Sequence, residues 1–543
     1  MSLKNSDKGG GSMITVIKSL SRNCIYLLVI GVSGYAHADV EISNAFSSHA
    51  VLQRNMNVPV WGKASPGEEV TVSVGGQSKT VTTTSNGTWR VLLDPMGAAG
   101  PLTMTIKGSN TVSVTDVYIG EVWQIAGQSN MDTRLSFYSN LADSIKSANV
   151  PLLRYYTLRQ PRQSTGGQNP WIVVSPSTAG NLSAMGYFFG KEILKVTDVA
   201  VGLVVTAVGG TTITQWMDPV TLRENPDIKN SDKGDIWDLW VAPAVGYGIK
   251  GTIWIQGEQN CNTADAPLYA DRFKILIEGW RAAWGQGDFP FYFGQLSSTS
   301  GTATPNDNSN VAKVREGQRL ALSLPNTAMS VNFDIGKGDW HYPAKPEAAR
   351  RLALPARALL YGEDDLEYSG PLYTGKIIDG STIKLVFTHT GGGLAAKGGD
   401  LSGFAIAGGT GSFVWGTATI SGDTVIVSSL SIKNPLHVRY GWSNVPSASL
   451  YNKDGLPASP FTTESPDVHI PTATVLPAVV PYTYTSFVTA HEPFYLNALG
   501  RRIAVDGSGC SPMIRYRCGV RGKVVMDKRR TVRRDRLEKW HDH

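Results

Sequence analysis

An alternation of strand-like and helix-like segments between residues 119 and 362 is the feature that most constrains the fold. Three apolar runs are typical of buried strands, namely 200–206, 251–255 and 289–296. Three further stretches are helix-like, namely 185–194, 269–284 and 347–360. Because a strand followed by a helix recurs, we expect a parallel sheet with helices on both faces and ligands at the carboxyl ends of its strands.

The regions on either side of this segment are typical of short β-strands. A chain of 543 residues is too long for one hydrophobic core, so several domains are expected. Residues 40–118 alternate or run β-branched between turns, and residues 363–465 return to this pattern between Gly-rich turns. We therefore predict three domains, a β-sandwich at 39–118, an α/β domain at 119–362 and a second β-sandwich at 363–465.

The N-terminal segment 1–38 has the layout of a leader and an export signal. A polar, Gly-rich stretch precedes Met13, and a basic flank, an apolar run at 24–32 and the sequence Ala36-His37-Ala38 follow. The apolar run is shorter than the roughly 20 residues that span a bilayer, and no later segment is typical of a membrane span. The sequence thus predicts a secreted or periplasmic protein.

The net charge of +6 arises in the C-terminal segment. Residues 466–543 hold 13 Lys and Arg against 7 Asp and Glu, so the rest of the chain is neutral. No basic stripe with interleaved aromatic residues lies in that neutral part, which argues against nucleic-acid binding. Residues 466–543 remain a basic tail without an assigned role.

Ser129 lies where a nucleophilic serine would be accessible. It follows the strand-like segment 120–126 and precedes Asn130-Met131, at a predicted strand-to-helix turn. The Gly-x-Ser-x-Gly elbow of the α/β-hydrolases is not present there. Since most serines in such turns cap a helix or a turn, Ser129 needs partners elsewhere to count as a nucleophile.

Two further segments place polar groups after predicted strands. Gly209 and Gly210 follow one strand, and their backbone N–H groups are candidate oxyanion donors. Gln256, Glu258 and Asn260 follow another, and they supply two amides and a carboxylate. Because an unpaired carboxylate is costly to bury, Glu258 is expected to have a role.

His341 is the candidate base. Asp339 lies two residues before it, and in an extended segment the two side chains would project from the same side. The carboxylate could then orient the imidazole and stabilise its cation. A histidine without such a partner is more often an ordinary surface or core residue.

Together, four segments resemble the SGNH hydrolases and, within them, the sialate O-acetylesterase family. These segments are Glu121-Val-Trp with Gly127-Gln-Ser-Asn-Met131, Gly209-Gly-Thr-Thr-Ile-Thr-Gln-Trp216, Trp254-Ile-Gln-Gly-Glu-Gln-Asn260 and Asp339-Trp-His341. The resemblance extends over residues 40–465, and it depends on the ordered combination of motifs. It implies a three-layer, flavodoxin-like α/β hydrolase domain with a parallel sheet, flanked by β-sandwich domains.

The resemblance also implies a serine esterase that removes acetyl groups from sugar hydroxyls, above all those of O-acetylated sialic acids. Ser129 would be the nucleophile, forming an acetyl-serine, and His341 the base. The groups that would hold the oxyanion are the backbone N–H groups of Ser129 and of Gly209 or Gly210, with the amide of Gln256 or Asn260. No metal or organic cofactor is implied.

The identity of the triad acid stays open. Family members read Asp-Ile-His-Pro, whereas this chain has Trp340 before the histidine and Tyr342 after it. Either Asp339 or Glu258 is then the acid, and the short tether to His341 favours Asp339.

The substrate also stays open. Arg134 is a candidate partner for the carboxylate of sialic acid, and Trp216 is a second candidate for substrate binding. An acetylxylan-type esterase would use the same chemistry on plant polysaccharides. A non-catalytic carbohydrate-binding protein is a third reading, and the sequence does not indicate the oligomeric state.

Overall fold

The computed structural model describes residues 39–158, 170–228, 234–336, 338–409 and 411–471, together with the backbone of 495–496 and 502–503. The predicted leader and export signal at 1–38 lie outside the described residues. Most of the basic tail at 466–543 lies outside them as well.

The α/β region is built on a sheet with strand order β10-β9-β11-β8-β12-β13-β14. Its strands are β8 (Thr111–Gly127), β9 (Val150–Thr157), β10 (Ile172–Val174), β11 (Val201–Val205), β12 (Gly251–Ile255), β13 (Phe291–Gly294) and β14 (Thr327–Ser330). Neighbours from β9 to β14 run parallel, whereas β10 pairs antiparallel with β9 at the edge. The predicted parallel sheet is present at the centre, and the edge strand makes the whole sheet mixed.

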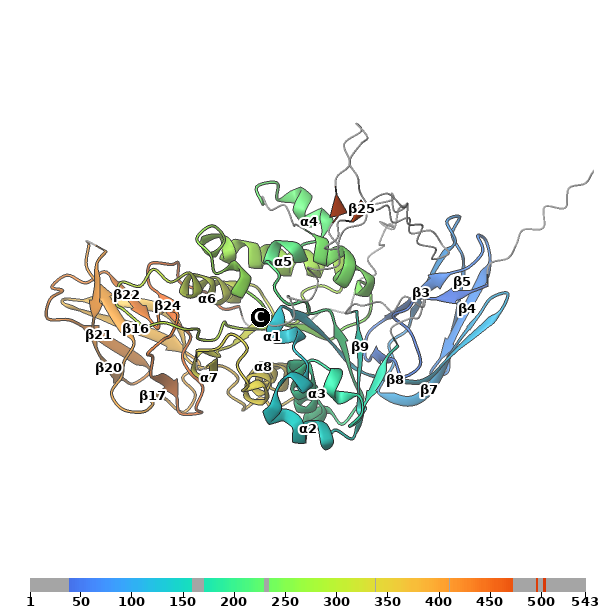
Figure 1. Cartoon of the computed structure of the whole chain (residues 1–543), viewed down its shortest axis with the longest axis horizontal. Helices are drawn as coiled ribbons and strands as arrows, with labels where there is room; N and C mark the ends of the chain where they lie inside the picture. The colour runs from blue at the N-terminus through green and yellow to red at the C-terminus, as the bar shows by residue number, and fades with distance from the viewer. Residues whose placement is uncertain are drawn as a thin grey trace, which may run out of the picture. The chain divides into compact units, whose positions relative to one another are not determined.

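Helices cover both faces of this sheet (Figure 1). They are α1 (Ser129–Asp132), α2 (Ala142–Lys146), α3 (Ala184–Thr197), α4 (Pro219–Glu224), α5 (Tyr269–Trp284), α6 (Asn310–Leu320), α7 (Phe333–Gly336) and α8 (Lys345–Leu360). Helices α3 and α8 share a core with Ile253 and Tyr292, whereas α5 shares a different core with Trp254 and Phe291. Successive side chains of β12 and β13 thus enter two separate cores, because strand residues alternate between faces.

Strand β8 continues from the N-terminal β region into the central sheet. Its first part pairs with β7 (Ala99–Lys107) and β2 (Val51–Gln53), and its second part pairs with β11 and β12. The other strands of this region are β1 (Glu41–Ile42), β3 (Val58–Lys63), β4 (Glu69–Val74), β5 (Gln77–Thr82) and β6 (Thr88–Leu93). The domain boundary expected at residue 118 therefore falls inside one continuous strand.

The C-terminal β region contains two four-stranded antiparallel sheets and one shorter pair. Its strands are β15 (Leu372–Asp379), β16 (Thr382–Thr388), β17 (Leu394–Ala396), β18 (Phe404–Ala407), β19 (Phe413–Trp415), β20 (Thr417–Ser421), β21 (Thr424–Ser428), β22 (His437–Tyr440), β23 (Leu450–Asn452) and β24 (Phe461–Thr462). In the C-terminal tail, β25 (Tyr495–Leu496) pairs with β26 (Arg502–Ile503). Apolar residues alternate along β16 and β21, so one face of that sheet is buried.

One buried arginine joins this region to the α/β region. Arg315 in α6 donates to the carbonyl oxygens of Leu296 and Ser297, just after β13, at 2.8 and 2.6 Å. It also donates to those of Ser443 and Asn444, in the loop after β22, at 2.7 and 3.3 Å. A single guanidinium group thus satisfies backbone acceptors on both sides of the contact.

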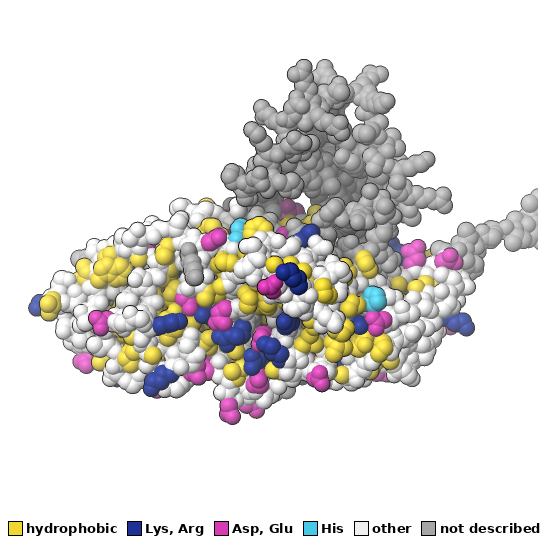
Figure 2. Space-filling view, turned by 60° about the horizontal axis from the view of Figure 1, so that its bottom comes forward, with side chains coloured by type: hydrophobic (Ala, Val, Ile, Leu, Met, Phe, Trp, Pro, Cys, Tyr) yellow, Lys and Arg dark blue, Asp and Glu magenta, His cyan; other side chains and the backbone are white. Residues whose placement is uncertain are grey.

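The surface of the described residues carries charges of both signs. On the face shown in Figure 2, acidic and basic side chains are interspersed. In the described part of the chain, no helix combines the length and the apolar character needed to cross a bilayer.

Candidate active site

Ser129 is the first residue of α1, and only Gln128 separates it from the end of β8. Gly127 has a φ of 122°, a conformation that favours glycine, and the chain turns there out of the sheet. The buried side chain of Gln128 accepts the N–H groups of Gly257 (3.2 Å) and Gln259 (3.4 Å), just after β12. The turn thus holds the partly exposed Ser129 at the carboxyl edge of the sheet, where ligands of parallel sheets bind.

Gly209 and Gly210 lie in the loop beside this turn. A side-chain carbon at position 209 would lie 3.5 Å from Cβ of Ser129, so Gly209 faces Ser129 at close range. The N–H of Val208 donates to the Gly127 carbonyl at 2.9 Å and fixes the loop. Both glycines are exposed, and their N–H groups have no acceptor among the described residues. These groups are available to a bound oxyanion.

Gln256 and Asn260 form a hydrogen-bonded pair in which Asn260 keeps an available donor. Nε2 of Gln256 donates to the Thr211 carbonyl (2.9 Å) and to Oδ1 of Asn260 (2.7 Å), so both of its hydrogens are used. Oδ1 of Asn260 also accepts the N–H of Ile213 at 3.0 Å. Its Nδ2 has no acceptor in the described part of the chain and is not sealed off from the surface. Of these two amides, Asn260 is therefore the one that can donate to an oxyanion.

His341 lies in an exposed turn between α7 and α8. Oδ1 of Asp339 accepts the backbone N–H of His341 at 2.8 Å, and no described residue is hydrogen-bonded to the imidazole. The expectation of an extended segment with the Asp339 carboxylate directed at the ring is therefore wrong. The reason is local, because an aspartate readily accepts the N–H two residues further on and closes a turn.

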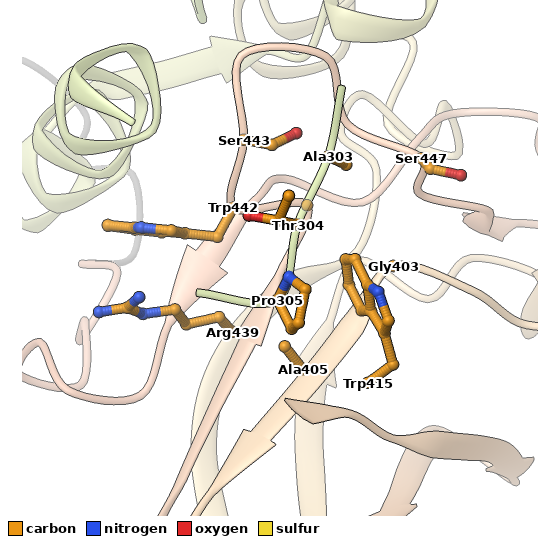
Figure 3. A pocket seen from close by; sticks show the side chains of 11 residues that line it. Ala303, Thr304, Pro305, Gly403, Ala405, Trp415, Arg439, Trp442, Ser443 and Ser447 are labelled. Atoms are coloured by element: carbon orange, nitrogen blue, oxygen red, sulfur yellow. The ribbon is translucent and has the colours of Figure 1, made fainter. Parts of the chain in front are cut away.

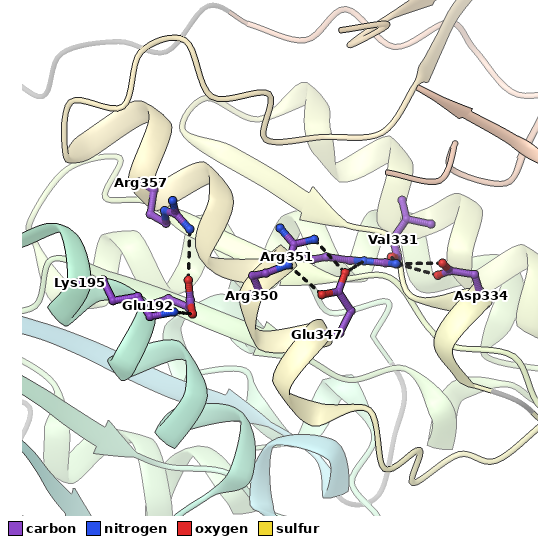
Figure 4. Close-up of polar contacts among 8 residues, drawn as sticks. All are labelled: Glu192, Lys195, Val331, Asp334, Glu347, Arg350, Arg351 and Arg357. Atoms are coloured by element: carbon purple, nitrogen blue, oxygen red, sulfur yellow. Dashed lines mark hydrogen bonds and ion pairs between the residues drawn. The ribbon is translucent and has the colours of Figure 1, made fainter. Parts of the chain in front are cut away.

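Ion pairs fasten the two helices that flank this turn (Figure 4). Arg351 in α8 donates to both carboxylate oxygens of Asp334 in α7, at 2.6 and 2.9 Å, and to the Val331 carbonyl at 2.7 Å. Glu347 accepts from Arg351 and from Arg350, both at 2.8 Å. Bidentate pairs of this kind have a defined geometry, and here the arginine is buried. The turn of the candidate base therefore begins and ends at fixed helices.

Asn130, the residue after the candidate nucleophile, connects that turn to the turn of the candidate base. Its Nδ2 donates to the Trp340 carbonyl at 2.9 Å and to Oε1 of Glu258 at 2.7 Å. Its Oδ1 accepts from Nζ of Lys345, the first residue of α8. Asn130 is 1% exposed and Lys345 is 0% exposed. One buried amide thus joins three loops and the start of a helix.

Burial shifts the titratable groups of this cluster toward their neutral forms. Burial raises the pKa of Glu258, opposed by hydrogen bonds and by the charge of Lys345. Burial lowers the pKa of Lys345 to about 7. The pKa of His341 is lowered by partial burial of the ring and then by Lys345, while Asp339 acts in the opposite direction. The imidazole is therefore neutral, as a base must be, to a lower pH than an ordinary histidine.

Trp216 was expected to bind substrate, and the structure shows that this is wrong. Its side chain is 0% exposed, and its Nε1 donates to Oγ1 of Thr211 at 2.9 Å. The ring contacts those of Trp254 and Trp280, with centroids 5.3 and 6.3 Å away. Trp216 is a core residue because the chain after Gly210 turns inward toward α5.

Arg134, the other residue expected to bind substrate, is only partly buried. Its Nη1 donates to Oδ1 of Asn181 at 3.2 Å, and its Nε is buried without a hydrogen-bond partner. Within the described ranges it forms no ion pair with a carboxylate. No carboxylate among the described residues thus neutralises its charge by direct contact.

A small pocket lies at the C-terminal β region, and its lining contains no residue of the candidate active site (Figure 3). Trp415, Trp442, Arg439 and Pro305 line it. Trp415 is 48% exposed, and the guanidinium of Arg439 lies 5.2 Å from the centroid of the Trp442 ring. Arg439 also forms an ion pair with Glu464 at 2.7 Å. The cation of this pocket already has a partner, and the pocket is not part of the candidate active site.

Two members of the site, Asn130 and Lys345, could not be predicted from the sequence. Asn130 directly follows Ser129 in the chain, but its contacts with Glu258 and the Trp340 carbonyl join segments far apart in the sequence. Lys345 is the first residue of α8, and a lysine at such a position is ordinarily expected to be exposed to solvent. The signal that identifies it is its burial, which only the folded chain shows.

The chain is similar to known carbohydrate esterases. Residues 119–353 match the family model described as "Carbohydrate esterase, sialic acid-specific acetylesterase". Human sialate O-acetylesterase is 30% identical over 403 residues, which cover 64% of this chain and 76% of that protein. Mouse sialate O-acetylesterase is 29% identical over 427 residues, covering 64% and 78%.

The fold is also similar to that of a solved enzyme. The crystal structure of a carbohydrate acetylesterase from Xanthomonas citri superposes with a TM-score of 0.72 at 36% identity. The superposition covers 78% of this chain and 99% of that chain. Most of the described residues therefore share one architecture with that protein.

Proposed function

The chain belongs to the sialate O-acetylesterase family and is a carbohydrate O-acetylesterase, and we propose that Ser129 and His341 carry out its reaction. The observation that carries this proposal is the hydrogen bond from Asn130 to the Trp340 carbonyl, at 2.9 Å. It brings the residue next to Ser129 against the residue next to His341. This contact between the turns of Ser129 and His341, at the edge of the sheet where substrates of such folds bind, supports the proposal.

In the proposed reaction, neutral His341 takes the hydroxyl proton of Ser129 as that oxygen attacks the acetyl carbonyl. The N–H groups of Gly209 and Gly210 and Nδ2 of Asn260 hold the oxyanion, since they have no other acceptor among the described residues. His341 then protonates the departing sugar oxygen and leaves an acetyl-serine. Water activated by the same imidazole releases acetate and restores the hydroxyl.

We propose Asp339 as the acid that supports His341, with Glu258 as the alternative. Asp339 lies on the same turn, and its negative charge raises the pKa of His341 against the effect of burial. Oε1 of Glu258 is bound to Asn130, and its Oε2 is buried without a partner. The carboxylate that acts on the imidazole electrostatically is thus Asp339.

Replacing Ser129 tests the nucleophile. We expect Ser129→Ala to lower acetate release from p-nitrophenyl acetate and from acetylated sugars by roughly 10⁴-fold, because no other group can form the acyl intermediate. A fluorophosphonate probe should label the native protein at Ser129 and leave this variant unlabelled. Ser136→Ala, at an exposed serine nearby, is the matched control and should keep native activity. Near-native acetate release by Ser129→Ala would refute the proposal.

We propose acetylated sialic acids as the substrate class, with acetylxylan-type polysaccharides as the alternative. The names of the relatives support the first class, and Arg134, without a carboxylate partner in the described ranges, could bind the carboxylate of sialic acid. We expect Arg134→Ala to lower activity on an acetylated sialic acid by about tenfold, the loss of one charge-assisted contact, and to spare an acetylated xylo-oligosaccharide. Equal losses on both substrates would contradict this role for Arg134.

We also propose a three-layer SGNH architecture for the α/β region, with β-sandwiches at 39–118 and 363–465. The helices on both faces of the sheet and the two four-stranded antiparallel sheets support it. Secretion or periplasmic export is proposed from the sequence of residues 1–38 alone.

A further inference from the structure

Lys345 is a buried residue of the site that has no step in the proposed reaction. Its Nζ donates to Oδ1 of Asn130 and lies 4.0 Å from the ring centroid of Tyr342 and 5.5 Å from that of Tyr138. Burying an ammonium group is costly unless other groups stabilise it, and no described carboxylate forms a direct ion pair with Lys345. The ring faces of Tyr342 and Tyr138 and the amide oxygen of Asn130 stabilise the ammonium group instead.

Glu258 lies at the other end of the same amide. Asn130 presents its oxygen to the ammonium group of Lys345 and its nitrogen to the carboxylate of Glu258. A flipped amide would direct N–H groups at the ammonium and the oxygen at the carboxylate, and both contacts would be repulsive. The two opposite charges therefore permit one orientation of the amide, the one in which Nδ2 also reaches the Trp340 carbonyl.

We propose that Lys345 is a positioning residue for the hydrolysis, which together with Glu258 fixes the orientation of the Asn130 amide. That amide holds the turn of the base against the turn of the nucleophile. The proposal rests on the roles assigned above to Ser129 and His341. Lys345 itself transfers no proton and forms no bond in the reaction of Ser129 and His341.

The charge of Lys345 has a second consequence, for the base. It lowers the pKa of His341, whereas Asp339, on the same turn, raises it. Glu258 and Asp339 in turn favour the charged form of Lys345, against burial. While Lys345 is charged, the imidazole loses its proton at a lower pH, so activity extends further into the acidic range.

Two substitutions separate positioning from charge. Lys345→Met removes both the donor to Asn130 and the cation, so we expect kcat to fall about tenfold or more through misplacement of the base, with little change in KM. The acid limb of kcat/KM should move to higher pH, because the imidazole loses a repelling charge. Lys345→Gln keeps an N–H donor but no charge, so it should retain more of kcat and show the same shift of the acid limb.

Lys191→Met is the matched control. That lysine also lies over a tyrosine ring, 5.4 Å from the centroid of Tyr187, but on α3 and outside the site. It should leave kcat and the acid limb unchanged. Thermal unfolding establishes that each variant is folded.

Native kcat and an unmoved acid limb in folded Lys345→Met would overturn the proposal. If Lys345→Met does not fold, a native acid limb in Lys345→Gln overturns it equally. Fluorophosphonate labelling of Ser129 separates this result from a failure of the proposed function, because labelling persists in the first case and is lost in the native protein in the second.

Discussion

Asp339 and Glu258 both lie near the candidate base, but the protein holds them differently. Asp339 is exposed, and its Oδ1 accepts a backbone N–H of its own turn. Glu258 is bound to Asn130, and burial raises its pKa. Of the two, Asp339 is the carboxylate on the turn of His341, and its charge acts on the imidazole. The difference is one of environment, not of residue type.

We expect Asp339→Asn to lower kcat by about 10²-fold or more, because the imidazolium ion formed in the reaction loses its stabilising carboxylate. Glu258→Gln should cost clearly less, since glutamine can still accept from Nδ2 of Asn130. Acetate release from p-nitrophenyl acetate measures both. Near-native activity of Asp339→Asn together with an inactive Glu258→Gln would assign the acid to Glu258 instead.

Single residues also show what a sequence can and cannot predict about a site. Ser129 and the glycines at 209 and 210 could be found because turns after strands have local signatures. It could not be predicted that Gln256 donates both of its hydrogens to Thr211 and Asn260, because those contacts form only after folding. The carboxylate of Asp339 was expected to contact the imidazole of His341, but it accepts the backbone N–H of His341 within a local turn.

Among the elements, the short helical turn η4 (Ile213–Trp216) shows how a residue of a functional motif serves the fold. Trp216 packs between β12 and α5, and its carbonyl accepts Nε1 of Trp280 at 2.9 Å. The turn therefore anchors the chain that leaves the glycine loop. Trp216 is fully buried and its polar groups are hydrogen-bonded, so it stabilises the fold that holds the site.

We expect Trp216→Ala to lower the free energy of unfolding by about 3–5 kcal/mol, the usual cost of a large cavity in an aromatic core. Chemical denaturation measures this loss. The variant that remains folded should keep a near-native kcat/KM, because the side chain does not reach the substrate. Trp415→Ala, at a tryptophan that is 48% exposed, is the control and should cost much less. A large selective loss of kcat/KM in Trp216→Ala would restore the substrate-binding role.

Elements were predictable where their side chains followed one period. Helix α5 and strand β12 have the expected bounds, because both are dominated by apolar residues that face a core. Helix α6 was missed, since Arg315, Gln318 and Arg319 are buried there and a polar pattern usually indicates exposure. Arg315 and Gln318 donate to the carbonyl oxygens of Ser297 and Gln256, which no local pattern contains, whereas Arg319 pairs with Glu316 of the same helix.

Across the whole molecule, Arg315 is one of the residues that join the C-terminal β region to the α/β region. Burial lowers its pKa to about 10, yet the guanidinium remains charged at neutral pH. Among the described residues its acceptors are four carbonyl oxygens and no carboxylate. The contact is therefore fixed by backbone geometry on both sides.

We expect Arg315→Met to lower the free energy of unfolding by roughly 3 kcal/mol or more, because several buried carbonyl oxygens lose their donor. Thermal or denaturant unfolding measures the loss. Lys313→Met, a partly exposed lysine of the same helix, should have a small effect. An Arg315→Met variant as stable as the native protein would mean that other donors replace the guanidinium.

The continuity of β8 limits how the molecule can be shortened. The segment that matches the family model starts at residue 119, within this strand. Two side chains from before residue 119 contact the second part of β8. Arg54 pairs with the buried Glu121 at 2.5 Å, and Gln53 accepts the N–H of Val122 at 2.7 Å. A truncated enzyme that begins at 119 would enclose a carboxylate without its cation. Any minimal esterase cut from this chain must therefore keep the N-terminal strands.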